Sequence, residues 1–348
     1  MKLLETNMDT LGPRQSAELI SKVSKHVHIH QSGIESLAMN LINLIKADRH
    51  SIHMKGWKTH QLHPAEANQS AIDWIFLVDA LNFSFWSVSP TKKFMVDYAG
   101  ETYTGYWTLC AAVNRALDEG IPITSAEYCK NFTIEKARHV FRSNSTTEMP
   151  MLEERVKVMQ EIGQVLLEKF DGSFSNCIAK ANGEARKLLQ LVTENFSCFR
   201  DEGVFNGRKV SFYKRAQILV ADLWACFEGE GLGRFDDIDS ITMFADYRIP
   251  QLLVYFNVLS YSEELDELLK KEHMFSNGDE IEMEIRGASI WAVELLAKSM
   301  NKIIQDDIEL KGVHINSILL DHFLWDYRRE HNVETQHVPF HRVRCIYY

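Results

Sequence analysis

Apolar residues recur every three or four positions through most of this chain, the spacing that places them on one face of an α-helix. The pattern predicts amphipathic helices over residues 16–27, 33–47 and 70–83, and it continues through most of the sequence that follows. Such a stripe of apolar side chains stabilises a helix by packing against its neighbours. We therefore expect a mostly α-helical protein.

Strand-like segments are few and short. Residues 94–107 contain two aromatic-rich runs separated by an Ala-Gly-Glu turn, which predicts a small β-hairpin. Residues 280–287 and 341–348 indicate two more short strands. Three polar stretches have the length of ordinary loops, and none has the composition of a linker, so we expect residues 1–348 to form a single domain. These polar stretches are residues 142–148, 200–209 and 307–314.

Composition narrows the class of ligand. The chain has 348 residues, of which 45% are hydrophobic and 25% charged, as in ordinary globular proteins. Its formal net charge is −10, whereas a protein that grips a nucleic-acid backbone needs a basic face. We expect no stable binding to nucleic acid, although a mononucleotide is compatible with this charge. The 19 Phe, 11 Tyr and 7 Trp fit either a large core or rings that stack on a heterocycle.

The cysteines and the apolar runs indicate where the protein works. None of the six cysteines forms a C-x-x-C spacing, and those inside apolar segments are typical of buried thiols in a reducing compartment. No apolar run is long enough for a signal peptide or a membrane span. We expect a soluble protein of the cytoplasm, or also of the nucleus, that makes no contact with a membrane.

The stretch ITMFADYRIPQLL places Asp246, Tyr247 and Arg248 inside an apolar sequence. An unpaired charge in an apolar interior is costly, which marks these residues as a candidate site. Ser240 as a helix N-cap and Pro250 in the first turn of a second helix would leave Asp246 at a break between two helices. A fixed carboxylate there suits a reaction that develops positive charge, such as cleavage of a glycosidic C–N bond. A plain N-cap role for Asp246 is the alternative.

Two other expected helices carry polar residues in apolar surroundings. On the helix over residues 70–83, Asp79, Asn82 and Phe83 share one face. An acid, an amide and a ring in this arrangement could read a heterocycle, or the two polar residues could simply cap the helix end. Lys214 lies at an expected helix start, where a cation is unfavourable unless it binds an anion such as phosphate or is solvated.

The stretch SILLDHFLWDYRRE predicts a helix in which Asp321 and Trp325 share one stripe, while Asp326 lies about 140° further round. Both acids could face a cleft from a buried helix end, or they could belong to a surface helix. The segment HVHIH has three alternating histidines but no acid or cysteine at ligand spacing, so we expect no metal site. Dinucleotide, Walker, G-x-S-x-G and H-E-x-x-H signatures are absent from the sequence, and we expect no cofactor.

Several long strings of the sequence resemble the queuosine salvage protein family, the queuosine-5′-phosphate N-glycosylases. They include DWIFLVDALNFSFWS, VSFYKRAQILVADLW, SITMFADYRIPQ and INSILLDHFLWDY, and the resemblance extends from Gly12 to Tyr348. It implies a helical fold similar to that of helical DNA glycosylases. It also implies hydrolysis of queuosine 5′-monophosphate to ribose 5-phosphate and queuine, the base that a tRNA-guanine transglycosylase then inserts into tRNA.

The same resemblance assigns roles to individual residues. The string FAD makes Asp246 the catalytic residue and Phe244 a ring that stacks on the base. Asp321 and Asp326 match positions that read the base or its cyclopentenediol arm. His322 stands where we expect an aromatic residue.

A histidine and a lysine complete the expected site. His60 matches a histidine of the family's pocket, and His63 is close enough to be the other candidate. Lys214 is the candidate for binding the 5′-phosphate, from its place at a helix start. The expected substrate-binding residues are His60, Asp79, Asn82, Phe83, Lys214, Phe244, Tyr247, Arg248, Asp321, His322, Trp325 and Asp326.

The chemistry of this substrate constrains the mechanism. A 7-deazapurine has carbon at position 7, so the leaving base cannot be protonated there. More of the catalysis then falls on stabilising the oxocarbenium ion and placing the water, which are the roles expected for Asp246. A covalent ribosyl intermediate on Asp246 is the other route.

Two other functions use the same residues differently. A queuine carrier, or a partner of the transglycosylase, would use the acids for binding alone. A glycosylase acting on polymeric nucleic acid would bind in a salt-sensitive way, which the acidic net charge disfavours.

Overall fold

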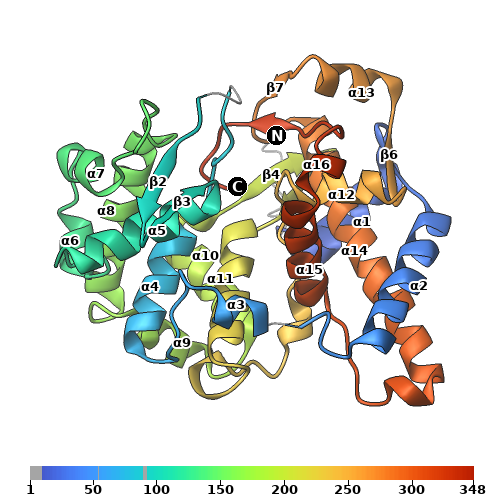
Figure 1. The fold of residues 1–348 in the computed structure, drawn as a ribbon, viewed down its shortest axis with the longest axis horizontal. Coiled ribbons are helices and arrows are strands. Elements are labelled where there is room, and N and C mark those ends of the chain that lie inside the picture. Colours follow the sequence, from blue (N-terminus) through green and yellow to red (C-terminus); the bar gives the residue numbers. More distant parts are fainter. Residues whose placement is uncertain (1–9, 54, 89–91) are drawn as a thin grey trace, which may run out of the picture. The chain divides into compact units, whose positions relative to one another are not determined.

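The computed structural model describes residues 10–53, 55–88 and 92–348; residues 1–9, where we expect no signal peptide, lie outside the described part. The described chain is mostly helical with small two-stranded sheets, which confirms the predicted class (Figure 1). Contacts between Cα atoms divide it into two compact units, while the single domain and the likeness to DNA glycosylases stay predictions. Unit 1 holds residues 10–53, 201–214 and 242–343; unit 2 holds residues 55–88, 92–200, 215–241 and 344–348.

The helices of unit 1 pack around one long helix. They are α1 (Pro13–Val23), α2 (Gln31–Ala47), α12 (Ile249–Tyr255), α13 (Glu263–Lys270), α14 (Glu280–Asp306), η4 (Ile308–Leu310), α15 (Ser317–Glu330) and α16 (Asn332–Thr335). The long helix α14 packs against α1, α2, α12 and α15 (Figure 1). Gly287 permits the close approach of α1, because a Cβ atom there would lie 2.7 Å from the Ile20 side chain.

The start of α14 corrects one prediction. The sequence predicts a short strand at residues 280–287, which is wrong, because these residues begin the helix. The alternation of polar and apolar residues is present, but Glu282, Glu284 and Arg286 are as buried as their apolar neighbours. Each of them has hydrogen-bond partners inside unit 1, so the alternation does not mark an exposed face.

Three strand pairs complete unit 1. The loop expected at residues 200–209 is wrong over most of its length, because Asn206 and Gly207, both at positive φ, close a tight hairpin. The strand predicted at residues 341–348 is confirmed over two residues. The pairs are β1 (Val27–Ile29) with β6 (Leu259–Tyr261), β4 (Glu202–Phe205) with β5 (Arg208–Ser211), and β7 (Met274–Phe275) with β8 (Arg342–Val343).

Unit 2 combines shorter helices with the predicted β-hairpin. The antiparallel strands β2 (Met95–Tyr98) and β3 (Glu101–Thr104) confirm the hairpin near residues 94–107. The first residue of α11 belongs to unit 1 and the rest to unit 2. The helices are α3 (Lys55–Thr59), α4 (Gln69–Ala80), α5 (Tyr106–Asp118), α6 (Ala126–Lys130), α7 (Ile134–Val140), α8 (Leu152–Lys169), α9 (Phe174–Ala181), α10 (Ala185–Asn195), η1 (Ser197–Phe199), α11 (Lys214–Cys226), η2 (Gly231–Gly233) and η3 (Ile238–Ser240).

Phenylalanine rings form much of the core of unit 2. Phe76 of α4 stacks on Phe174 of α9 with ring centroids 4.1 Å apart, and its ring also lies edge-on to Phe196. Phe196 in turn stacks on Phe170. These rings are buried, so part of the aromatic content predicted to serve either packing or ligand stacking serves packing.

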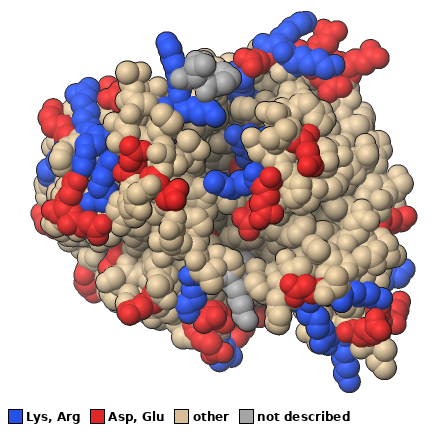
Figure 2. Space-filling view, viewed as in Figure 1, with Lys and Arg blue, Asp and Glu red and all other residues tan. Residues whose placement is uncertain are grey.

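The cysteines are buried, as the sequence predicts, and the surface carries charged side chains of both signs. All six cysteines are buried free thiols. On the face in Figure 2, acidic and basic side chains are interspersed. No helix in the described part of the chain is long and apolar enough to cross a membrane.

Candidate active site

Asp246 lies in a segment without regular secondary structure, two residues before Arg248, the N-cap of α12. Its Oδ1 atom accepts hydrogen bonds from the backbone N–H groups of Arg248, at 2.7 Å, and Ile249, at 3.2 Å. Pro250 occupies the first turn of α12, as predicted. The first helix expected before Asp246 is wrong, because Ser240 ends the short helix η3 and the residues from 241 to 246 form neither helix nor strand. Asp246 therefore binds the backbone at the start of one helix and does not lie between two.

Asp321 of α15 lies against the same segment. Its Oδ2 atom accepts a hydrogen bond of 2.8 Å from the N–H of Phe244, and its side chain is buried. Burial and then the negative charge of Asp246 raise the pKa of Asp321 well above its usual range, while the Phe244 N–H and Lys214 oppose this shift. Unit 1 thus brings together four predicted site residues: Lys214, Phe244, Asp246 and Asp321. Burial holds Asp321 toward its neutral form.

Lys214 begins α11 and is 6% exposed. Its backbone N–H donates to Oδ2 of Asp201 at 3.1 Å, so a carboxylate offsets the charge conflict expected at this helix start. Tyr213, immediately before it, has a φ of +50°, a conformation that costs energy for a residue with a side chain. The backbone around Lys214 is therefore held in place by Asp201.

The other predicted residues of α15 lie round the helix. The ring of His322 meets Phe244 edge-on at 5.9 Å, and burial lowers the pKa of His322 to about 4, so the imidazole is neutral at pH 7. The Trp325 ring lies under the guanidinium of Arg329. Asp326 is on the exposed side, as the helical spacing predicts, and partial burial raises its pKa to about 6.

Tyr247 and Arg248 belong to a neighbouring aromatic cluster. The Tyr247 ring packs on Phe340 at 5.3 Å, and the Arg248 guanidinium lies 4.9 Å and 5.0 Å from the centroids of these two rings. Nη1 of Arg248 donates to Gln251 one turn later in the chain. These contacts hold the start of α12 against the segment around Phe340.

In unit 2, the residues Asp79, Asn82 and Phe83 are buried but do not share a helical face. The helix α4 ends at Ala80, so the prediction of one helical stripe is wrong. Asn82 donates to Oδ1 of Asp79 at 3.4 Å, a contact between side chains, while the backbone N–H of Leu81 caps the helix end. The helix is capped at its other end by Asn68 instead of by Ser70.

Phe83 lies between two buried arginines. The guanidinium of Arg155 is 4.2 Å from the ring centroid, and that of Arg215 is 5.1 Å away. These contacts occupy the Phe83 ring within unit 2. They place Phe83 in the core of the unit.

His60 and His63 both lie in an aromatic cluster of unit 2. The His60 ring is stacked on Trp107 with centroids 3.5 Å apart and 7° between the planes. Nδ1 of His63 lies 2.8 Å from the carbonyl oxygen of Trp57, and its Nε2 lies 3.1 Å from the hydroxyl of Tyr106. Periodicity in the sequence gave no sign of these aromatic partners.

Two of the three histidines of HVHIH contact serine hydroxyls. Nδ1 of His26 lies 2.9 Å from the hydroxyl of Ser262, and Nε2 of His30 lies 2.7 Å from that of Ser260. Their segment is the strand β1 in place of the predicted end of a helix. Among the described residues, no cluster of three metal-binding side chains occurs.

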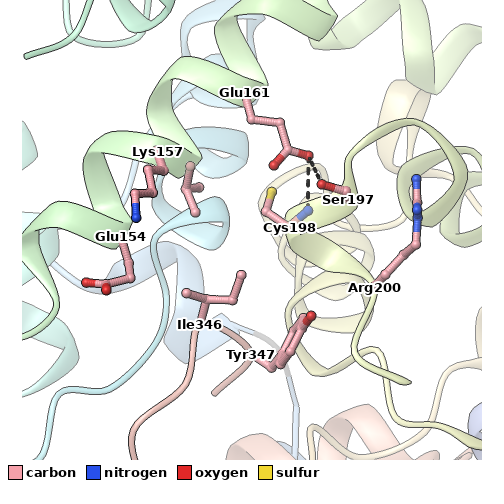
Figure 3. A pocket seen from close by; sticks show the side chains of 9 residues that line it. Glu154, Lys157, Glu161, Ser197, Cys198, Arg200, Ile346 and Tyr347 are labelled. Atoms are coloured by element: carbon pink, nitrogen blue, oxygen red, sulfur yellow. Dashed lines mark hydrogen bonds between the residues drawn. The ribbon is translucent and has the colours of Figure 1, made fainter. Parts of the chain in front are cut away.

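A pocket of about 440 Å³ opens in unit 2, and none of the predicted site residues of that unit lines it (Figure 3). It lies between α8, η1 and the segment at Ile346 and Tyr347, and Glu161 accepts hydrogen bonds across it from Ser197 and Cys198. Its lining mixes acidic and basic side chains without an excess of either charge. Its residues therefore give no reason to treat it as the active site.

Residues 345–348, the CIYY segment, are hydrogen-bonded to residues that follow α4. The N–H of Ser84 donates to the carbonyl of Tyr348 at 3.0 Å, and its hydroxyl donates to the carbonyl of Cys345 at 3.0 Å. Arg344 reaches the carbonyls of Ser84 and Trp86. These contacts lock the fold of unit 2.

Two buried residues of unit 1 escaped sequence analysis. Asp201 forms an ion pair with Arg286 of α14, 85 positions later in the chain, and Arg286 donates to the carbonyl of Ala245. Asp201 lies in the segment expected to be a loop, and Arg286 lies in the segment expected to be a strand. Arg286 follows alternating glutamates and apolar residues, so the local sequence gave no sign of this pairing.

Comparison with known proteins identifies the family. The family model described as queuosine salvage protein matches residues 62–348. A Bos taurus protein named queuosine 5′-phosphate N-glycosylase/hydrolase is 51% identical over 339 residues, covering 97% of this chain and 99% of the relative. Relatives of the same name are 41% identical in Schizosaccharomyces pombe, covering 96% and 99%, and 38% identical in Sphaerobacter thermophilus, covering 83% and 84%. The chain therefore belongs to the queuosine salvage protein family.

Proposed function

We propose that this protein hydrolyses the N-glycosidic bond of queuosine 5′-phosphate, with Asp246 as the catalytic carboxylate. It is an N-glycosidase of queuosine salvage: relatives at 41% to 51% identity over nearly the whole chain are named for that activity. The observation that carries the choice of Asp246 is the pair of backbone N–H groups that hold its Oδ1 atom beside Asp321. A carboxylate fixed in this way needs no reorganisation when positive charge develops nearby.

The reaction divides between breaking the C–N bond and adding water. As the bond from C1′ to the base breaks, its electron pair leaves with the base, and the ribosyl group becomes cationic. The anion of Asp246 stabilises this cation and orients the water, whose oxygen bonds to C1′ while one of its protons passes to Asp246. A proton returns to the base, so queuine and ribose 5-phosphate are the products.

The neighbours of Asp246 have distinct proposed roles. Asp321, held toward its neutral form, carries a hydroxyl that can donate a hydrogen bond to the leaving base. Such help is needed because the carbon at position 7 of the base cannot be protonated. Phe244 supplies a ring for the base, and Lys214 supplies a cation for the 5′-phosphate. The buried position of Lys214 would give such a contact more strength than a solvated one.

Base release from a set of nucleotides tests the function. Purified protein is incubated with queuosine 5′-monophosphate, with queuosine and with GMP, and free base is followed by chromatography. We expect queuine from the monophosphate, little from the nucleoside and none from GMP. No release from any of the three, with queuine still bound by the protein, would replace this proposal with a queuine carrier.

The fate of the product is part of the proposal. Queuine passes to a tRNA-guanine transglycosylase, in the cytoplasm or also in the nucleus. A coupled assay with transglycosylase, unmodified tRNA and queuosine 5′-monophosphate should modify the tRNA only when this protein is present. Cell fractionation with an antibody to the protein gives its location.

A further inference from the structure

Asp201 and Arg286 form a nearly inaccessible ion pair in unit 1. Nη1 and Nη2 of Arg286 donate to Oδ1 and Oδ2 of Asp201 at 2.9 Å and 2.5 Å, and the two side chains are 1% and 3% exposed. The ring of Phe212 lies 4.2 Å from the guanidinium carbon, and Glu282 accepts a third hydrogen bond from Nη1. The guanidinium is thus fixed on several sides.

The pair reaches the main chain next to two proposed site residues. Nε of Arg286 donates at 3.0 Å to the carbonyl of Ala245, the residue before Asp246. Oδ2 of Asp201 accepts from the N–H of Lys214 at 3.1 Å. One ion pair therefore ties together the backbone of Asp246 and that of Lys214, which are distant in the chain.

Asp201 also holds the turn that leads into Lys214. Its carbonyl accepts from the N–H of Phe212 at 3.0 Å and from that of Tyr213 at 3.5 Å. Tyr213 has the positive φ that a residue with a side chain adopts only when its surroundings require it. The direction in which Lys214 leaves the turn depends on Asp201.

Stability alone is a weak reason to bury this pair. Removing two charges from water costs much of what their attraction returns, and apolar replacements of such pairs are often as stable. An ion pair that joins two backbone segments can also fix the positions of reacting groups on those segments. This matters because displacing a reacting group by about 1 Å can slow a reaction about 100-fold. The place of the pair fits that role.

We infer that Arg286 and Asp201 are positioning residues that set the Asp246 carboxylate and the Lys214 ammonium in working geometry around the substrate. The inference rests on the proposed function, since it assigns the pair to the same site. It gives the pair no contact with the substrate. Its effect is on the chemical step more than on binding.

The test compares kcat and KM for queuosine 5′-monophosphate in two variants. Arg286→Lys keeps the charge but cannot hold both Asp201 and the Ala245 carbonyl; we expect kcat to fall about 100-fold, with KM changed less than about threefold. Asp201→Asn is nearly isosteric and keeps an acceptor for Lys214; we expect kcat to fall about tenfold. Rates are expressed per folded site, counted by titration with queuine.

Glu284→Gln is the matched control. Glu284 lies on the same helix, is fully buried, and accepts from the backbone N–H groups of Lys25 and His26, away from Asp246. We expect it to lower the melting temperature about as much as Arg286→Lys while kcat stays within about twofold of the wild type. A loss of kcat in the control equal to that in Arg286→Lys would show a purely structural role and overturn the inference.

The outcomes separate this inference from the proposed function. Failure of the wild-type protein to release queuine contradicts the proposed function. Release by the wild type and loss of release in Asp246→Asn, with kcat unchanged in the Arg286 and Asp201 variants, contradicts only the inference. If Arg286→Lys does not fold, Asp201→Asn decides, since an unchanged kcat in that variant is enough to reject the positioning role.

Discussion

Each unit has a buried arginine that cross-links segments within that unit, but the partners of the two arginines differ. In unit 2, Arg155 donates to the main-chain carbonyls of Leu81, Phe83 and Pro150, and burial lowers its pKa to about 9. In unit 1, Arg286 meets two carboxylates as well as one carbonyl. Carbonyl groups supply acceptors without a compensating charge, whereas carboxylates also set the local electrostatics.

The difference between the partners of Arg155 and Arg286 matches the kind of residues that surround each arginine. Around Arg155 lie the end of α4 and the Phe83 ring, where a cross-link between main-chain segments is enough. Around Arg286 lie the segment of Asp246 and the start of α11, which carry charged side chains of the proposed site. We therefore expect changes in unit 2 to act mainly on stability, and changes near Arg286 to act mainly on turnover.

The largest effect is expected for Asp246→Asn. The amide keeps the size of the side chain but removes the charge that stabilises the ribosyl cation, so kcat should fall about 1,000-fold while queuine still binds. Steady-state kinetics and a queuine titration measure the two quantities. Asp307→Asn is the control, because Asp307 also accepts a backbone N–H, from Glu309, at the start of a short helix. Near-normal turnover in Asp246→Asn would remove this residue from the mechanism.

Arg155→Lys should lower stability instead of turnover. A lysine has only one nitrogen where Arg155 places three against separate carbonyls, so the free energy of unfolding should fall by about 3 kcal/mol, with kcat per folded protein within about threefold of the wild type. Urea unfolding and steady-state kinetics measure both. Arg115→Lys, which changes a less buried arginine that holds the carbonyls of Val140 and Arg142, should cost less. A tenfold fall in kcat for Arg155→Lys would end the distinction between the two regions.

Asp321→Asn should alter the pH dependence of turnover. In the wild type the raised pKa favours the neutral form of Asp321, and activity that needs its hydroxyl declines as the pH rises through that pKa. An amide is neutral throughout, so the variant should lose this decline and be about tenfold slower at low pH. Profiles of kcat/KM from acid to alkaline pH test this. The same decline in both proteins would assign it to another group.

The smallest effect is expected for His322→Phe and concerns stability. Because burial lowers the folded pKa of His322 to about 4 from 6.5, the unfolded chain binds a proton first as the pH falls. His322 alone therefore costs the wild type stability between pH 6.5 and pH 4, by about 2 kcal/mol at pH 5 relative to pH 7, and buried His341, whose pKa is lowered to about 3, adds a separate loss. His322→Phe should remove most of the loss due to His322, and exposed His28→Phe should not. Equal pH dependence in all three proteins would contradict the shift.

Local signals in the sequence predicted part of this picture. The hairpin of β2 and β3 was predicted because its turn separates two aromatic runs. Asp246, Tyr247 and Arg248 were candidates because the stretch around them is otherwise apolar, and the catalytic role of Asp246 stays a prediction. The Asn206-Gly207 hairpin was also readable, since that dipeptide is a strong turn signal. The fold class followed from periodicity alone.

Other features depend on partners far away in the chain. The helix α4 ends before Asn82, where Arg155 takes the carbonyls of Leu81 and Phe83 from more than 70 positions away. The pairing of Asp201 with Arg286 spans 85 positions. A stripe calculated over one helix contains no information about such contacts, which is why the shared face of Asp79 and Asn82 was predicted wrongly.

The tie between Ser84 and the CIYY segment has a consequence for biosynthesis. The two partners are 261 positions apart, so the region around Ser84 leaves the ribosome long before Cys345 exists. Until then the backbone groups that follow α4 lack their final acceptors and donors. A contact of this sequence separation also slows folding, because a long loop must be ordered before it forms. The region around Ser84 therefore reaches its final hydrogen bonds only after residues 345–348 have been synthesised.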